Sequence, residues 1–140
     1  MNIKKLIIGG FIGGIIFFLI GYLEYGVVLN NFYATHHSLP APGHVYRSHI
    51  MFQYILLGNL FAGLLMSFVI LKSNSKTVFE GLINAGIVGF LLCASVDSLS
   101  YSMAVLMSLK AILVEVVAYT FISAVAGAVI TFIFSKMKSD

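Results

Sequence analysis

The chain has 140 residues, of which 60% are hydrophobic and only 9% are charged, and its formal net charge is +3. Because soluble domains carry about 25% charged residues, this composition excludes an ordinary water-soluble domain and indicates a membrane protein. The basic residues are concentrated at one end of the predicted helices, which is a sign of membrane topology, so they predict no nucleic-acid partner. The expected partner is the lipid bilayer.

Four continuous apolar runs are each long enough to cross a bilayer as a helix, which takes about 20 residues. In chain order, the predicted helices cover about residues 6–29, 51–71, 78–103 and 111–135. Thr77 and Glu80 have the spacing of a capping box at the start of the third helix. The interval 30–50 contains both prolines of the chain and is predicted to be an external loop. The sequence therefore predicts an all-α polytopic membrane protein, with residues 1–140 forming a single four-transmembrane-helix bundle.

Small residues recur at a spacing of four on the first and third predicted helices, and in lipid such residues allow the backbones of two helices to approach closely. The residues concerned are Gly9, Gly10, Gly13 and Gly14 in the first helix and Gly81, Ala85 and Gly89 in the third. We expect these faces to pack inside the chain. The alternative is that the glycine-rich faces join copies of the chain or dock it into a larger membrane complex.

A weak internal repeat relates the first two predicted helices to the last two. The aligned pairs are Gly10 and Gly86, Gly13 and Gly89, Tyr25 and Tyr101, Gly63 and Gly127, and Ser67 and Thr131. This alignment predicts two tandem helical hairpins in the same orientation, related by an axis along the membrane normal, as in some transporters.

The basic residues are unevenly divided between the two ends of the predicted bundle. One end has Lys4, Lys5, Lys72, Lys76, Lys136 and Lys138, whereas the other has Arg47 and Lys110. Since cytoplasmic loops carry an excess of Lys and Arg, this distribution predicts that both termini are cytoplasmic.

Three acidic residues lie near the outer ends of three different predicted helices, namely Glu24, Asp97 and Glu115. A carboxylate in mid-membrane costs about 2.5–3.5 kcal/mol, so we expect these side chains to turn away from lipid, towards one another or towards a shared wet cavity. On the first helix, Glu24 has the helical spacing that places it on one face with Gly14 and Val28.

These acids, together with neighbouring polar residues, predict an outward-facing site for a cation or a small protonatable ligand, which the protein binds or transports. The candidate ligand-binding residues are Asp97, Glu24, Glu115, Tyr101, Tyr25 and Asn59. In the competing interpretation the acids are protonated or paired structurally, and the protein is a non-catalytic accessory or assembly subunit of a larger membrane complex.

All four histidines of the chain, His36, His37, His44 and His49, fall in the predicted external loop. Imidazole is a common transition-metal ligand, so two or three of them with a carboxylate could hold a divalent metal such as Zn²⁺ or Cu²⁺. Their spacing matches no standard metal motif, and a solvated loop is the alternative. The sequence also lacks the nucleophile, zinc-hydrolase, dithiol and phosphate-loop motifs of common enzymes. An enzymatic activity is therefore not favoured, and a membrane metalloenzyme that uses the histidine-rich loop above the acids is the open alternative.

Three apolar segments carry a resemblance to known sequences: "ILLGNLFAGLLMSFVILK" (55–72), "GLINAGIVGFLLCASVDSLSYSM" (81–103) and "VEVVAYTFISAVAGAVI" (114–130). Here the chain resembles a group of small hypothetical bacterial inner-membrane proteins that are classed only as a domain of unknown function. The resemblance implies a four-helix, multi-pass protein of the bacterial inner (cytoplasmic) membrane, and it implies no particular activity.

Overall fold

The computed structural model describes residues 2–36, 49–104 and 106–137, and nearly all of them are helical. The elements in chain order are α1 (Ile3–Gly21), the π-helix η1 (Tyr22–Val28), α2 (Asn30–His36), α3 (Phe52–Ser73), α4 (Val78–Met103) and α5 (Leu109–Lys136). Four continuous helices are long and apolar enough to span a membrane: Ile3–Val28, Phe52–Ser73, Val78–Met103 and Leu109–Lys136. The predicted all-α, multi-pass fold is confirmed.

Short polar side chains cap the starts of α1, α4 and α5. The Oδ1 atom of Asn2 accepts a hydrogen bond from the Lys5 amide at 3.1 Å, which explains why α1 starts three residues before the apolar run. Thr77 and Glu80 form the predicted capping box at α4. Ser108 caps α5 by accepting a hydrogen bond from the amide of Ala111 at 3.2 Å.

The prediction of a loop over residues 30–50 is wrong for its first part, because residues 30–36 form α2. No glycine or proline interrupts the chain between Asn30 and His36, so the backbone re-enters a helix directly after η1. The amide of Tyr33 donates to the Leu29 carbonyl at 2.9 Å, and the Tyr33 side chain is buried, only 9% exposed. Burial of this aromatic ring holds α2 against the N-terminal end of α5.

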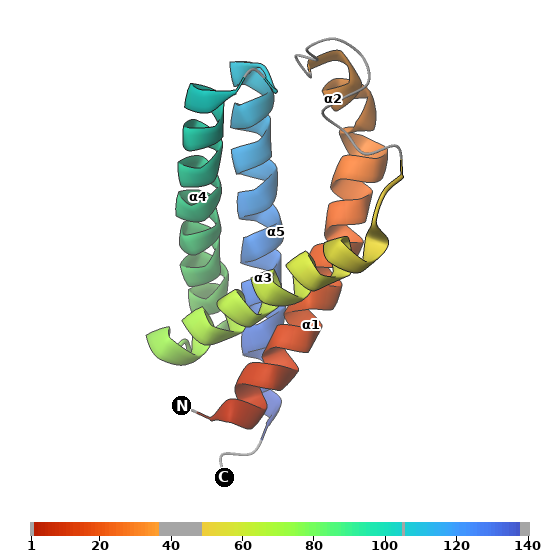
Figure 1. The fold of residues 1–140 in the computed structure, drawn as a ribbon. Coiled ribbons are helices and arrows are strands. Elements are labelled where there is room, and N and C mark those ends of the chain that lie inside the picture. The colour runs from red at the N-terminus through yellow and green to blue at the C-terminus, as the bar shows by residue number, and fades with distance from the viewer. Residues whose placement is uncertain (1, 37–48, 105, 138–140) are drawn as a thin grey trace.

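The long helices pack as two hairpins, with α1 against α3 and α4 against α5. A Cβ atom placed on Gly63 of α3 would meet the backbone of α1 at Gly10, Gly13 and Gly14. The glycine faces therefore pack inside the chain, as expected. The two predicted tandem hairpins are present, and Figure 1 shows the start of α1 and the end of α5 at the same end of the bundle.

Contacts within the two hairpins correspond to one another. Ser67 lies against Gly9 and Thr131 against Gly81, while Gly63 lies against Gly13 and Gly127 against Ala85. These pairs place Gly13 of α1 in the position of Ala85 in α4. The sequence alignment had matched Gly13 with Gly89, which is one helical turn further along. Gly- and Ala-rich helices align almost equally well one turn apart, so only the contacts across each hairpin fix the register.

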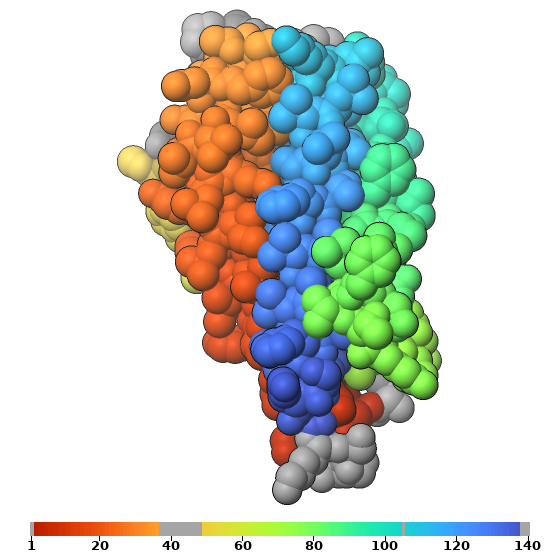
Figure 2. Space-filling view, turned by 180° about the vertical axis from the view of Figure 1, so that it is seen from behind, coloured from red at the N-terminus to blue at the C-terminus, as the bar shows by residue number. Residues whose placement is uncertain are grey.

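Helix α5 is the central element of the bundle. Figure 2 shows it running between α1 and α4 along one face of the molecule. Its side chains Ile122 and Ile130 join Phe17 of α1 and Met66 and Ile70 of α3 in one buried core. Helix α3 crosses α1 obliquely, so its first half stands away from α4 and α5 (Figure 1). Every residue from 52 to 58 is consequently exposed in the isolated chain.

Candidate functional site

Glu115, in the second turn of α5, is the centre of the polar cluster. The Tyr25 hydroxyl donates to Glu115 Oε1 at 3.1 Å, and the Tyr33 hydroxyl donates to Glu115 Oε2 at 2.5 Å. The two tyrosine rings lie against each other, with centroids 5.9 Å apart. Hydrogen bonds to a carboxylate are stronger than those between neutral groups. Three separate elements, η1, α2 and α5, are therefore held together at one carboxylate.

The π-helix η1 sets the orientation of Tyr25. Its last turn closes with a bond from the Leu29 amide to the Glu24 carbonyl at 2.6 Å, which is the five-residue spacing of a π-helix. Because a π turn contains more residues than an α turn, side chains after Gly21 rotate away from their α-helical positions. Tyr25 points to α5, whereas Val28 is 71% exposed. The expectation that Val28 continues the buried face of α1 is therefore wrong.

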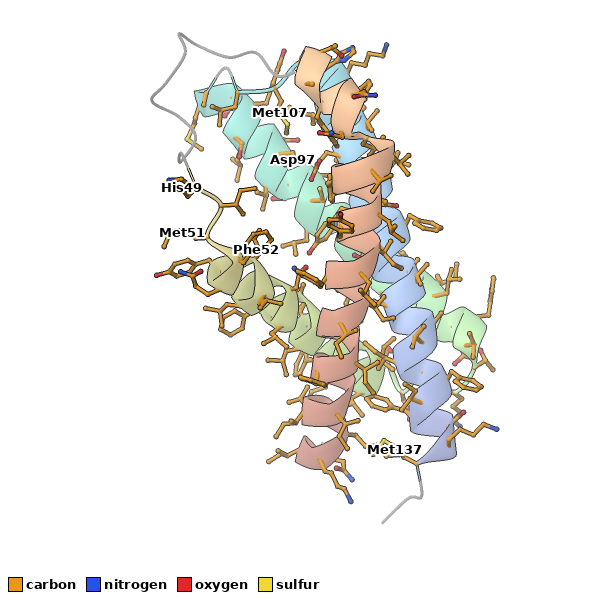
Figure 3. All side chains as sticks on the ribbon, turned by 90° about the vertical axis from the view of Figure 1, so that its right-hand side faces the viewer. His49, Met51, Phe52, Asp97, Met107 and Met137 are labelled. Atoms are coloured by element: carbon orange, nitrogen blue, oxygen red, sulfur yellow. The ribbon has the colours of Figure 1, made fainter. Side chains whose placement is uncertain are left out.

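Asp97 lies on α4 and is partly buried. Its Oδ2 atom accepts a hydrogen bond from the Cys93 thiol, one turn earlier, at an Sγ to Oδ2 distance of 3.1 Å. Both side chains lie close enough to Tyr33 to interact with it electrostatically. Figure 3 shows Asp97 in the same half of the bundle as Met107, which lines the cavity beside Glu115. Asp97 thus borders the Glu115 cluster through Tyr33.

Glu24 borders the cluster from the other side. It lies within electrostatic range of Glu115. Its Oε2 atom is buried and, among the residues that the structure describes, accepts no hydrogen bond. The side chain also lines a cavity of about 540 Å³ between η1 and α5, together with Lys110. A buried carboxylate oxygen without a partner is costly unless the group is protonated or meets a donor or a cation.

The three acids therefore gather at one end of the bundle with Glu115 between the other two. Glu115 lines a cavity of about 380 Å³ with Tyr25, Tyr33 and Met107, while Glu24 lines the separate one next to Lys110. The expectation was that these side chains turn towards one another or towards a shared wet cavity. In the structure the acids lie around the rings of the two tyrosines, beside separate cavities.

Two of the predicted site residues lie outside the Glu115 cluster. Tyr101 is 49% exposed on the surface of α4. Asn59 on α3 donates from Nδ2 to the Ile55 carbonyl at 2.9 Å, within its own helix, and lines a different, largely apolar cavity. The structure therefore does not bring either side chain to the acids.

Sequence reasoning missed Tyr33 and Cys93 as members of the site. Tyr33 was assigned to a loop, although the absence of glycine and proline around it was a signal for a helix. Burial, followed by the hydrogen bond to Glu115, raises the pKa of the Tyr33 hydroxyl above its ordinary value. Tyr33 therefore remains a hydrogen-bond donor at any physiological pH.

The histidines are only partly described. His37 and His44 lie outside the described residues. His36 stacks on the Phe32 ring at 4.2 Å, and its Nδ1 lies 2.9 Å from both Thr35 Oγ1 and the Phe32 carbonyl oxygen. His49 lies just before α3, away from Asp97 (Figure 3). Within the described ranges, no three side chains of the types His, Cys, Asp or Glu are grouped to hold a metal ion. The metal site of two or three of these histidines with a carboxylate stays a prediction.

No protein family, curated protein or solved structure matches this chain. The resemblance to small bacterial membrane proteins of unknown function stays a prediction.

Proposed function

We propose that the protein binds a cation or a small protonatable ligand at the Glu115 cluster, and that it does so as a multi-pass protein of the bacterial inner membrane. The observation that carries this proposal is the Glu115 carboxylate, fixed by two tyrosine hydroxyls at the meeting point of three elements. An ionisable side chain held at this depth in a membrane bundle is a common mark of a substrate or ion site.

The charge of the cluster favours a cationic ligand. Within the part of the chain that the structure describes, the hydrogen-bond partners of Glu115 are neutral hydroxyls, and that of Asp97 is a neutral thiol. Neutral donors orient a carboxylate but leave its negative charge in place. A bound cation would neutralise that charge.

The expected orientation places this site on the outer side of the membrane. The described basic residues at the end of the bundle where α1 begins and α5 ends are Lys4, Lys5, Lys72, Lys76 and Lys136, whereas Arg47 and Lys138 lie outside the described residues. The rule that cytoplasmic segments are enriched in Lys and Arg assigns that end to the cytoplasm. Glu115 is at the opposite end, so ligand would enter from outside. Binding alone and transport both remain consistent with this arrangement.

An accessory-subunit role has weaker support. It would use the glycine-rich faces of α1 and α4 to dock a partner, yet these faces contact α3 and α5 of the same chain. Partners of this kind would need a different surface.

Isothermal titration calorimetry of the protein in lipid nanodiscs tests the proposal. Sodium, potassium, methylammonium and tetramethylammonium are titrated in turn into the wild type and into matched variants. We expect saturable binding of at least one cation, weakened at least tenfold by Glu115→Gln and, to a smaller degree, by Asp97→Asn. Glu80→Gln is the control, because it removes one negative charge at the other end of the bundle and retains a residue suited to the capping box. Absence of binding by all four cations, or equal binding by Glu115→Gln, would contradict the proposal.

A further inference from the structure

The cavity that Asn59 lines lies beside the Glu115 cluster, and its chemistry differs from that of the two cavities at the acids. It has a volume of about 560 Å³ and lies between α1, η1, the first half of α3 and α5. Its walls are mainly hydrophobic and include six aromatic rings, those of Phe17, Phe18, Tyr22, Tyr25, Phe52 and Tyr119. The volume is within the range of about 300–1,000 Å³ that is usual for sites of small organic molecules.

Tyr25 connects this aromatic cavity with the acids. Its ring lines both the aromatic cavity and the smaller cavity that contains Glu115. Its hydroxyl donates to Glu115 at 3.1 Å, and the side chain also interacts electrostatically with Glu24. One end of the aromatic cavity therefore adjoins negative charge. The polar residues in the rest of the lining are Asn30, Asn59, Tyr22 and Tyr119, and the other lining residues are apolar.

We propose that the ligand of the Glu115 site is a hydrophobic organic cation, whose apolar body occupies the aromatic cavity and whose charge lies at the Tyr25 end. This inference depends on the proposed function and narrows the class of ligand. Aromatic faces attract cations, with about 0.5–2 kcal/mol for each favourable contact, and the Glu115 carboxylate adds a full charge. An anion of the same shape would be repelled, and a small inorganic cation would leave the apolar walls unfilled.

The oblique course of α3 gives this cavity one wall that a variant can change without touching the acids. Ile55 on α3 lines the cavity and is 42% exposed. Leu57, two residues later on the same helix, is 46% exposed and lies outside the cavity lining. Replacing each by tryptophan adds the same ring to the same helix, but only Ile55→Trp adds it at the cavity wall.

The experiment measures equilibrium binding of tetraphenylphosphonium to the protein in phosphatidylcholine nanodiscs, with empty nanodiscs subtracted for partition into lipid. Tetraphenylborate, an anion of almost the same size and shape, is the comparison ligand. We expect saturable binding of tetraphenylphosphonium near one per chain, at least tenfold tighter than that of tetraphenylborate. Ile55→Trp should weaken this binding at least tenfold, whereas Leu57→Trp should change it less than twofold.

The outcomes separate this inference from the proposed function. If Ile55→Trp and Leu57→Trp bind tetraphenylphosphonium alike while small cations still require Glu115, the cavity assignment is wrong and the proposed function stands. If small cations do not bind, or bind without Glu115, the proposed function itself fails. Equal binding of tetraphenylborate would show that the cavity takes any hydrophobic molecule and would overturn the cationic class. Loss of tetraphenylphosphonium binding when phosphatidylethanolamine replaces phosphatidylcholine would instead identify a lipid amine as the occupant.

Discussion

A substitution at Gly63 of α3 tests how closely α1 and α3 pack in the first hairpin. A Cβ atom at this position would lie 2.8 Å from the carbonyl carbon of Gly13 and even closer to the backbone of Gly10 and Gly14. Non-bonded carbon atoms pack at about 3.5–4.0 Å, and backbone atoms cannot rotate away as a side-chain end can. Gly63→Ala must therefore separate α1 from α3.

Gly58, five residues earlier on the same helix, is the matched control. A Cβ atom there would have no neighbour within 4 Å among the atoms that the structure describes. Alanine is favoured over glycine in a helix by about 0.5–1 kcal/mol, whereas forced overpacking costs about 1–3 kcal/mol. We expect Gly63→Ala to lower the free energy of unfolding by about 1–2 kcal/mol and Gly58→Ala to leave it unchanged or raise it slightly.

The assay is reversible unfolding of the protein in mixed micelles by increasing the fraction of denaturing detergent, followed by the loss of helical circular dichroism. The two variants contain the same chemical change, so the effect of helix propensity cancels in their comparison. Equal unfolding free energies for Gly63→Ala and Gly58→Ala would refute the close approach of α1 and α3.

Two further predictions follow from particular hydrogen bonds. Thr77→Ala removes the side chain that caps α4 and should cost about 0.5–2 kcal/mol of unfolding free energy in the same detergent titration; an unchanged value would show that the capping box is not formed. Tyr33→Phe removes the hydroxyl whose pKa is raised in the folded protein. A raised folded-state pKa means that stability is complete below the ordinary tyrosine value of about 10 and declines as the pH rises above it. This alkaline decline should be smaller in Tyr33→Phe than in the wild type, and identical pH profiles would contradict the burial of Tyr33.

The positions of the four long helices could be predicted because hydropathy over about 20 residues is a strong signal. The capping box at Thr77 could be predicted equally well, since it depends only on local residue types. The identity of the packing faces on α1 was predicted as far as Gly14, where regular α-helical spacing holds. In each of these cases, the residues close together in sequence determine the structure.

The candidate site was harder to predict from the sequence because its geometry depends on an irregular segment. Tyr22–Val28 has the hydropathy of an α-helix, and nothing in its residue types marks the π turn that rotates Tyr25 towards Glu115. The short helix α2 was hidden by the prolines that follow it. Sequence reasoning therefore found the three acids but did not show that Glu115 is central, because its partners come from segments more than 80 residues away.

The angle at which α3 crosses the bundle could not be predicted from the sequence either. Hydropathy places Asn59 in a spanning helix but gives no crossing angle, so its separation from the acids could not be foreseen. The oblique crossing at Gly63 determines both that separation and the aromatic cavity beside Tyr25.

The most direct test of the account is whether a bound cation reaches the Glu115 carboxylate. Infrared difference spectra of the protein in nanodiscs, recorded with and without methylammonium, report the carboxylate stretching bands. If the cation binds at Glu115, we expect a ligand-induced shift of these bands that is lost in Glu115→Gln and retained in Glu80→Gln. A shift that persists unchanged in Glu115→Gln, or a spectrum without any carboxylate change at saturating ligand, would contradict it.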